Sequence, residues 1–218
     1  VLYCDVDFLW TADVSEIWAL RDPGKSLQAC PDDWSSTLEK ESVWYAAHGI
    51  DVDVSRYVCS GLLLINLKRF RAEDLSRRLM VFLCAHTDVL YADQSAINAV
   101  VPDIGILPRK WGRFARSLHG AELPGAWAIH FAGSAPWKDG WWTQAITDAH
   151  GLWYRTYAQL TGIGYLDAVR TFLTPRQYGT RRLTWTLATH ALLRIPFLIL
   201  LRLARRACYI PEIKEMAR

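Results

Sequence analysis

VLYCDVD, residues 1–7, is a short apolar run that ends in two aspartates separated by a single residue. Its first four residues have the composition of a strand, and Asp5 and Asp7 mark the corner where that strand would give way to a loop. A second apolar run, YVCSGLLLINL at residues 57–67, is long enough for a fully buried strand. The two runs predict a sheet with a covered interior and with polar side chains at its strand ends.

Helix patterns separate these runs from further strand signals. Asp13 can cap a short helix, and Ser36 with Glu39 three residues later is typical of a capping box at the start of another. The predicted helices cover residues 13–20, 36–48, 68–86 and 93–101, and two more strands cover residues 26–30 and 126–131. Strands that alternate with helices indicate an α/β domain with a mostly parallel central sheet.

The bulk composition is that of a folded protein. Of the 218 residues, 51% are hydrophobic and 22% are charged, which is enough to bury a core and argues against disorder. The five cysteines are widely spaced and form no CxxC pair, so neither a disulfide framework nor a zinc knuckle is expected. We therefore expect a cytoplasmic protein. Because the chain opens on a strand without an initiator methionine, we also expect further strands of the domain to precede residue 1.

Basic residues gather at the end of the chain. Residues 176–218 hold nine lysines and arginines against two glutamates, whereas the preceding residues carry a small net negative charge. We place a boundary near residue 179, with a globular domain over residues 1–178 and a helical tail over residues 179–218. The acidic body gives no reason to expect a nucleic-acid partner, and only the tail would be attracted to an anionic surface.

The tail is rich in leucine but does not have the pattern of a transmembrane helix. His190, Arg194 and Pro196 interrupt its apolar run, which is then shorter than the ~20 residues that a spanning helix needs. We expect an interfacial amphipathic segment that holds the protein peripherally on the inner face of an anionic membrane. The alternative is a helix packed on the body with a solvated basic face.

Two Asp-x-Asp triplets are candidates for metal binding. Asp5 and Asp7 follow a predicted strand, where open α/β sheets bind ligands, whereas Asp51 and Asp53 lie in a predicted solvated loop. The first pair is either a metal site or a polar strand end. Two carboxylates there would offer oxygen ligands to a Mg²⁺ or Mn²⁺ ion that also binds a diphosphate. His130 ends an apolar strand and is either a third ligand, which would favour Mn²⁺, or a buried structural histidine.

Five motifs, in order along the chain, resemble those of glycosyltransferase family 8. They are VLYCDVD at residues 1–7, CSGLLLINLKRFR at 59–71, DQSAIN at 93–98, LPRKW at 107–111, and IHFAG with a following PW at 129–137. The second and the last motifs are the most specific. The resemblance implies a GT-A type fold, a UDP-sugar donor, and Mn²⁺ or possibly Mg²⁺ as cofactor. It also implies transfer of a hexose to a saccharide or lipid-linked acceptor, with retention at the anomeric carbon.

The resemblance further implies a role for each matching residue. Asp5, Asp7 and His130 would hold the metal ion. Asp93 would bind hydroxyl groups of the donor sugar. Gln94 would lie beside the anomeric carbon, where an amide can stabilise positive charge but cannot act as a strong base. The residues implied on the donor side are Asp5, Asp7, Cys59, Ser60, Gly61, Gly133 and Lys138.

Four positions depart from the family pattern. Cys59 stands where the family has an asparagine that contacts the sugar, and Ser95 replaces an acidic residue after the glutamine. Gly112 replaces an asparagine after the tryptophan. The family's Lys-Pro-Trp becomes Ala135-Pro136-Trp137, which removes a lysine that would contact the diphosphate, unless Lys138 takes its place.

Two further interpretations stay open at this point. The departures are compatible with an inactive family member or fragment that acts as a binding module. An aspartyl-phosphate phosphatase would instead use Asp5 as nucleophile and Asp7 as acid. Against this, Leu9 stands where such enzymes need threonine or valine, and no late pair of acidic residues follows.

Overall fold

The computed structural model describes residues 1–118, 120–133, 135–137 and 148–173. Val1–Leu173 form one compact unit. The predicted boundary near residue 179, the tail that follows it and Lys138 all lie outside the described residues. Within the described ranges, no helix combines the length and the hydropathy that a bilayer crossing requires.

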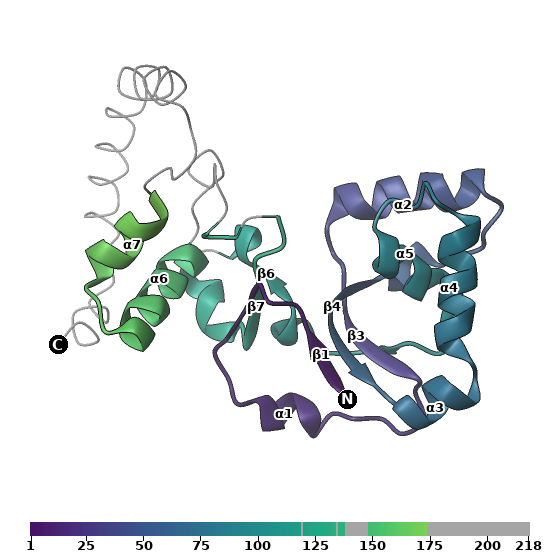
Figure 1. The fold of residues 1–218 in the computed structure, drawn as a ribbon, viewed down its shortest axis with the longest axis horizontal. Helices are drawn as coiled ribbons and strands as arrows, with labels where there is room; N and C mark the ends of the chain where they lie inside the picture. Colours follow the sequence, from purple (N-terminus) through teal and green to yellow (C-terminus); the bar gives the residue numbers. More distant parts are fainter. Residues whose placement is uncertain (119, 134, 138–147, 174–218) are drawn as a thin grey trace, which may run out of the picture. The chain divides into compact units, whose positions relative to one another are not determined.

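Four strands form the first sheet, in the order β1, β4, β3, β5. Figure 1 labels the first three of them. The four strands are β1 (Leu2–Cys4), β4 (Val58–Ile65), β3 (Leu27–Pro31) and β5 (Gly105–Ile106). β4 runs antiparallel to both of its neighbours, and β5 is parallel to β3. The strands predicted in the first 67 residues are therefore confirmed, with β3 and β4 almost entirely buried, as their apolar runs require.

A second, smaller sheet has the order β2, β7, β6. Its strands are β2 (Phe8–Trp10), β7 (Ala128–His130) and β6 (Arg113–Phe114). β7 is antiparallel to β2 and parallel to β6. The strand predicted over residues 126–131 is confirmed in a shorter form. β2 and β6 were not predicted, because two or three residues are too few to show an alternating pattern.

The α/β class is confirmed, but the described strands form two mixed sheets rather than one mostly parallel sheet. Alternating strand and helix signals do not specify the direction in which each strand returns. The connection from β3 to β4 contains both a helix and a loop, so it can bring the chain back from either end of the sheet. It brings β4 back antiparallel to β3.

The helices up to residue 100 agree with the predicted segments, with some shifts, whereas the two helices after residue 147 were not predicted. The helices are α1 (Val14–Trp18), α2 (Ser35–Ala47), α3 (Leu67–Ala72), α4 (Leu75–Ala85), α5 (Ala92–Val100), α6 (Asp148–Thr161) and α7 (Tyr165–Leu173). Short 3₁₀ helices cover Val54–Arg56, Arg109–Trp111, Ala115–Ser117 and Gly120–Gly125. The segment predicted as one helix over residues 68–86 is divided into α3 and α4 at Asp74, which has a φ of 52°.

Of the two predicted N-caps, one is confirmed and one is wrong. The carboxylate of Asp13 accepts a hydrogen bond from the backbone N–H of Ser15 at 2.8 Å, at the start of α1. The capping box at Ser36 and Glu39 does not form, because α2 starts at Ser35 and its N-cap, Trp34, makes no side-chain cap bond. The turn before α2 is organised instead by Asp32, whose Oδ1 accepts from the Trp34 N–H at 2.9 Å.

The two faces of β4 pack into different parts of the core. Leu63 on one face joins Leu75 of α4 and Ile97 of α5, and Figure 1 shows these helices on one side of the first sheet. Leu62, on the other face, joins a cluster that includes Trp111. This is the alternation expected of a strand that is covered on both faces.

The chain crosses from the first sheet to the second within residues 5–7. The Asp5 N–H donates to the Gly61 carbonyl at 2.8 Å, which extends the pairing of β1 with β4. The Phe131 N–H donates to the Asp7 carbonyl at 2.8 Å, which extends the pairing of β2 with β7. Both ends of the crossing are therefore anchored, each to a different sheet.

Candidate functional site

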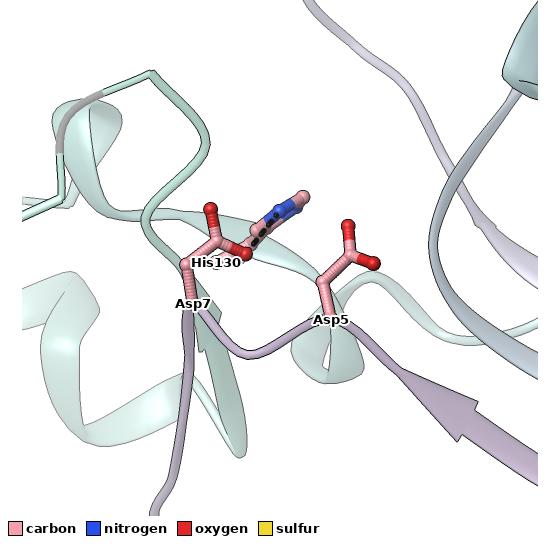
Figure 2. Close-up of side chains that lie close together, drawn as sticks. All are labelled: Asp5, Asp7 and His130. Atoms are coloured by element: carbon pink, nitrogen blue, oxygen red, sulfur yellow. Dashed lines mark ion pairs between the residues drawn. The ribbon is translucent and has the colours of Figure 1, made fainter. Parts of the chain in front are cut away.

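Asp5, Asp7 and His130 converge at this crossing. Each offers one carboxylate oxygen or ring nitrogen, and these atoms all lie within 4.8 Å of one another. Nε2 of His130 is 3.2 Å from Oδ1 of Asp7, and Figure 2 shows the Asp5 carboxylate facing the same space from the other end of the turn. The structure thus brings together, from segments more than 120 residues apart, the three residues that the resemblance implied as metal ligands.

The imidazole of His130 is held between two phenylalanines. Phe8 and Phe114 are its register partners on the two neighbouring strands, β2 and β6. The Phe8 ring stacks on the imidazole with centroids 4.3 Å apart, and the Phe114 ring stacks at 5.5 Å. This row of three rings leaves His130 only 5% exposed and fixes the plane of its ring.

Gly61 and Cys59, both on β4, also contact His130. A Cβ atom on Gly61 would lie 2.5 Å from Cε1 of the imidazole, so only glycine leaves room for the ring. Sγ of Cys59 lies 3.7 Å from Nδ1 of His130. Burial raises the pKa of the Cys59 thiol to about 12, so the group is a neutral thiol at physiological pH. The resemblance implied both residues on the donor side, and in the structure both are packed against the histidine.

Tyr3 orients the carboxylate of Asp5. Its hydroxyl donates to Oδ1 of Asp5 at 2.6 Å. This hydrogen bond, together with partial burial and repulsion from Asp5 and Asp93, raises the pKa of Tyr3 to about 12. Asp93, in the first turn of α5, is exposed, and its charge contributes to this raised pKa.

Gln94 occupies the first turn of α5 and is only 9% exposed. Its Nε2 donates to Oδ2 of Asp32 at 2.9 Å, and its Oε1 accepts from the Ser60 N–H at 3.1 Å. Both the nitrogen and the oxygen of the amide therefore have hydrogen-bond partners, which fixes the orientation of the side chain. Burial raises the pKa of Asp32, against the opposing effects of the Trp34 and Gln94 hydrogen bonds.

Asp32 was not predicted as a site residue, although a signal was present. It directly follows β3, as Asp5 directly follows β1. Polar residues at strand ends are the rule by which Asp5 was selected, and the same rule applied to residues 26–32 selects Asp32. Tyr3, Phe8 and Phe114 offered no comparable signal, because aromatic residues in strands are far more often core.

Two departures from the family pattern have a structural explanation. Ser95 Oγ donates to Oε1 of Glu41 at 3.0 Å, and Glu41, on α2, is fully buried. An acidic side chain at position 95 would bring a second carboxylate against the buried Glu41, which serine avoids. At Gly112 a Cβ atom would lie 2.7 Å from Cβ of Cys30, so a side chain of any size is excluded there.

The final motif is only partly described. Gly133 has a φ of 67°, a left-handed conformation that favours glycine, and open space lies where a Cβ atom would be. Ala135 is fully buried, and the Pro136 carbonyl accepts from the Tyr154 hydroxyl at 3.1 Å. Position 135 therefore has no room for the family's lysine in this arrangement.

Comparison with known proteins decides the family. The sequence profile of Glycosyl transferase family 8 matches residues 1–140, which is more than half of the chain. The chain belongs to this family. General stress protein A of Bacillus subtilis (strain 168) is 26% identical over 107 residues, which cover 47% of this chain and 35% of that protein. The family 8 chain thus spans about a third of this relative.

Solved structures show the fold. An active-site mutant of LgtC superposes with a TM-score of 0.54 at 22% identity, over 74% of this chain and 60% of LgtC. The glycosyltransferase GlyE of Streptococcus pneumoniae TIGR4 gives a TM-score of 0.53 at 17% identity, over 79% of this chain and 42% of GlyE. The WbbM bifunctional glycosyltransferase gives 0.51 at 19% identity, over 69% and 31%. The GT-A type fold expected of a family 8 member is confirmed.

The family 8 site is chemically suited to a divalent metal ion. The three donor atoms all lie within 4.8 Å of one another, so small side-chain adjustments would let one ion reach all of them at the metal–oxygen distance of about 2.1 Å that Mg²⁺ requires. Two carboxylates and one imidazole also form a donor set that Mn²⁺ accepts readily. These three residues fit the ion that the family implies.

Proposed function

We propose that this protein is a metal-dependent, retaining glycosyltransferase that moves a hexose from a UDP-sugar to a saccharide or lipid-linked acceptor. The observation that carries the proposal is the convergence of Asp5, Asp7 and His130 at the crossing between the two sheets. Membership of family 8 supports it, as does the fold shared with LgtC, a galactosyltransferase solved in complex with donor and acceptor sugar analogues.

Asp5, Asp7 and His130 would hold Mn²⁺, with Mg²⁺ as the alternative. The ion supplies positive charge that stabilises the departing nucleoside diphosphate. Tyr3 fixes one carboxylate and the Phe8–Phe114 pair fixes the imidazole, so the ligands are largely oriented in advance. The Asp93 carboxylate, exposed at the start of α5, would accept hydrogen bonds from hydroxyl groups of the donor sugar.

Gln94 would act beside the anomeric carbon. Its amide is neutral and cannot abstract a proton, but the negative end of its dipole can stabilise positive charge on the sugar ring as the bond to the diphosphate breaks. Donation to the Asp32 carboxylate polarises the amide in the direction that makes Oε1 more negative. The acceptor oxygen then bonds to the anomeric carbon, and its proton passes to a diphosphate oxygen on the same face.

The tail would place the enzyme at a membrane. It holds eight basic residues against two acidic ones, which supports attachment to an anionic cytoplasmic surface, where a lipid-linked acceptor would also lie. We propose that residues 179–218 make this contact and that the catalytic body faces the cytoplasm.

The second candidate function is an inactive binding module. The buried Ala135 favours it, because the residue that would contact the diphosphate in the family is missing at this position. The phosphatase hypothesis is set aside, since the chain belongs to family 8 and Leu9 replaces a residue that such enzymes need.

One experiment separates the two candidates. The full chain is incubated with a panel of UDP-sugars and saccharide or lipid-linked acceptors, with Mn²⁺ or with EDTA. We expect Mn²⁺-dependent release of UDP together with a glycosylated product whose anomeric configuration matches that of the donor by NMR. Mn²⁺-dependent UDP binding by calorimetry without any transfer would favour the binding module. A product of inverted configuration would contradict the retaining mechanism.

A further inference from the structure

Both ring nitrogens of His130 have a neighbour within reach. Nε2 lies 3.2 Å from Oδ1 of Asp7, and Nδ1 lies 3.7 Å from Sγ of Cys59. The second contact is buried, since Cys59 is 9% and His130 5% exposed. A buried ring nitrogen without a hydrogen-bonding partner costs roughly 1–3 kcal/mol. The atom next to Nδ1 therefore affects the tautomer and the orientation of the imidazole.

The ring has little freedom to find another partner. Phe8 and Phe114 stack on it from the two neighbouring strands, and Gly61 brings the β4 backbone against its Cε1 edge. Rotation of the imidazole would therefore collide with β4 or break the ring stacking. Cys59 is the side chain that β4 presents to Nδ1 in this confined position.

We propose that Cys59 is a positioning residue for the metal site, which holds His130 with Nε2 directed at the ion. The inference rests on the proposed function, because it assumes that Asp5, Asp7 and His130 bind a metal. It also changes the assignment of position 59 in this chain from sugar contact to support of a metal ligand.

The thiol is chemically suited to this task. A neutral thiol is both a weak donor and a weak acceptor. In the metal-free protein Nδ1 can accept from the Cys59 S–H, with the ring hydrogen on Nε2, which lies 3.2 Å from the Asp7 carboxylate. When Nε2 uses its lone pair for a metal ion, Nδ1 carries the hydrogen and donates it to Sγ. Cys59 therefore satisfies Nδ1 in both tautomers, without any net gain or loss of protons.

Cys30 supplies a matched control within the same core. It is also a buried cysteine, 2% exposed, on the strand next to β4, but its Sγ lies 3.7 Å from the Pro108 carbonyl and not against His130. Cys59→Ala and Cys30→Ala each remove one buried sulfur atom and leave a similar cavity. A purely structural role predicts that the two variants behave alike.

The test is calorimetry of Mn²⁺ binding to the full chain in the presence of UDP, with thermal unfolding of the metal-free proteins as the stability readout. We expect Cys59→Ala to weaken Mn²⁺ binding about tenfold. This is the lower end of the range for residues that hydrogen-bond a metal ligand, because a thiol forms only weak hydrogen bonds. Cys30→Ala should lose similar thermal stability and keep its Mn²⁺ affinity. Cys59→Ser, which retains both a donor and an acceptor, should restore most of the affinity.

Each other outcome has a definite meaning. If wild-type protein binds Mn²⁺ and Cys59→Ala binds it equally well, the positioning role is overturned while the proposed function stands. Equal losses of affinity in both alanine variants would also overturn it, since the effect would then follow from core damage. A wild-type chain that binds no Mn²⁺ with UDP would overturn the proposed function and this inference together.

Discussion

Nε2 of Gln94 donates a hydrogen bond to Oδ2 of Asp32 at 2.9 Å, which ties the first turn of α5 to the residue that follows β3. The amide proposed to face the sugar ring is thus anchored by a buried carboxylate. The orientation and the polarity of Gln94 both depend on this charged partner, because the Ser60 N–H that donates to the amide oxygen is neutral.

Asp32→Asn should lower turnover by roughly 10- to 100-fold, the equivalent of about 1.5–3 kcal/mol for a lost hydrogen bond to a charged group. Thermal stability should change little, since the substitution keeps the shape of the side chain and removes a buried charge. Steady-state kinetics and thermal unfolding of the same sample test both statements. Unchanged turnover would mean that Asp32 has no part in orienting the amide.

The activity should also have an acid limit set by Asp32. Burial raises its pKa above the ordinary range of an aspartate, so the carboxylate becomes protonated at a higher pH than an exposed one as the pH falls. If the ionised form is required, turnover falls on the acid side at this raised pKa. The pH profile of turnover should show this limb in the wild type and lack it in Asp32→Asn.

Gln94→Ala should reduce turnover far more than donor affinity, on the order of 100-fold or more, because its contribution would be confined to the charge-developing step. Asp93→Ala should damage donor affinity and turnover together, since it would bind the sugar in both states. Comparison of kcat with the donor KM distinguishes the two. A rise in the donor KM alone for Gln94→Ala would contradict its placement beside the anomeric carbon.

Metal binding should require Asp5, Asp7 and His130 together. Alanine at any of the three should abolish Mn²⁺-dependent UDP binding measured by calorimetry. Asp51→Ala is the matched control, since Asp51 and Asp53 have the same spacing and Asp51 is exposed. If His130→Ala kept full binding, His130 would be a structural histidine and not a ligand.

Gly61→Ala should affect both stability and the site. Its new Cβ atom would lie 2.5 Å from the His130 imidazole, and overpacking of this kind costs about 1–3 kcal/mol in free energy of unfolding. Mn²⁺ affinity should fall as well, because the ring must move. Gly125→Ala is the control, as open space surrounds that position and its free energy of unfolding should change by less than about 0.5 kcal/mol. Chemical denaturation and calorimetry measure the two effects.

Residues after about position 179 should hold the protein on anionic membranes and be dispensable for the chemistry. Attraction of basic residues to anionic lipid is worth ~1 kcal/mol each near the surface and is screened by salt, whereas burial of leucine side chains is not. Binding to phosphatidylserine-containing vesicles should therefore weaken but persist as salt rises. Truncation at residue 179 should abolish vesicle binding and preserve transfer to a soluble acceptor. A truncated protein that unfolds would show that the tail belongs to the core.

Strand ends were predictable from the sequence, and the partners that they meet were not. The apolar runs located β1, β3 and β4, and the rule of polar residues at strand ends selected Asp5 and Asp7. The contact between residues 7 and 130 depends on β2 and β6, which are too short to leave a pattern. Local signals failed where a tertiary contact replaced them, as at Ser36, where Asp32 organises the start of α2 instead. The role of Cys59 was hidden for the same reason, because it depends on a histidine 71 residues away.

The crossing between the sheets also limits how this stretch can change in evolution. The Asp5 N–H is hydrogen-bonded to β4, and the Asp7 carbonyl is hydrogen-bonded to Phe131, directly after β7, so the number of residues between these two anchors is fixed. An inserted or deleted residue would change the geometry of this turn and move one carboxylate away from His130. Val6, between them, is 96% exposed and contributes little to either sheet. Position 6 can therefore vary freely in identity while the spacing stays constant, which makes it the natural attachment point for a spectroscopic label beside the site.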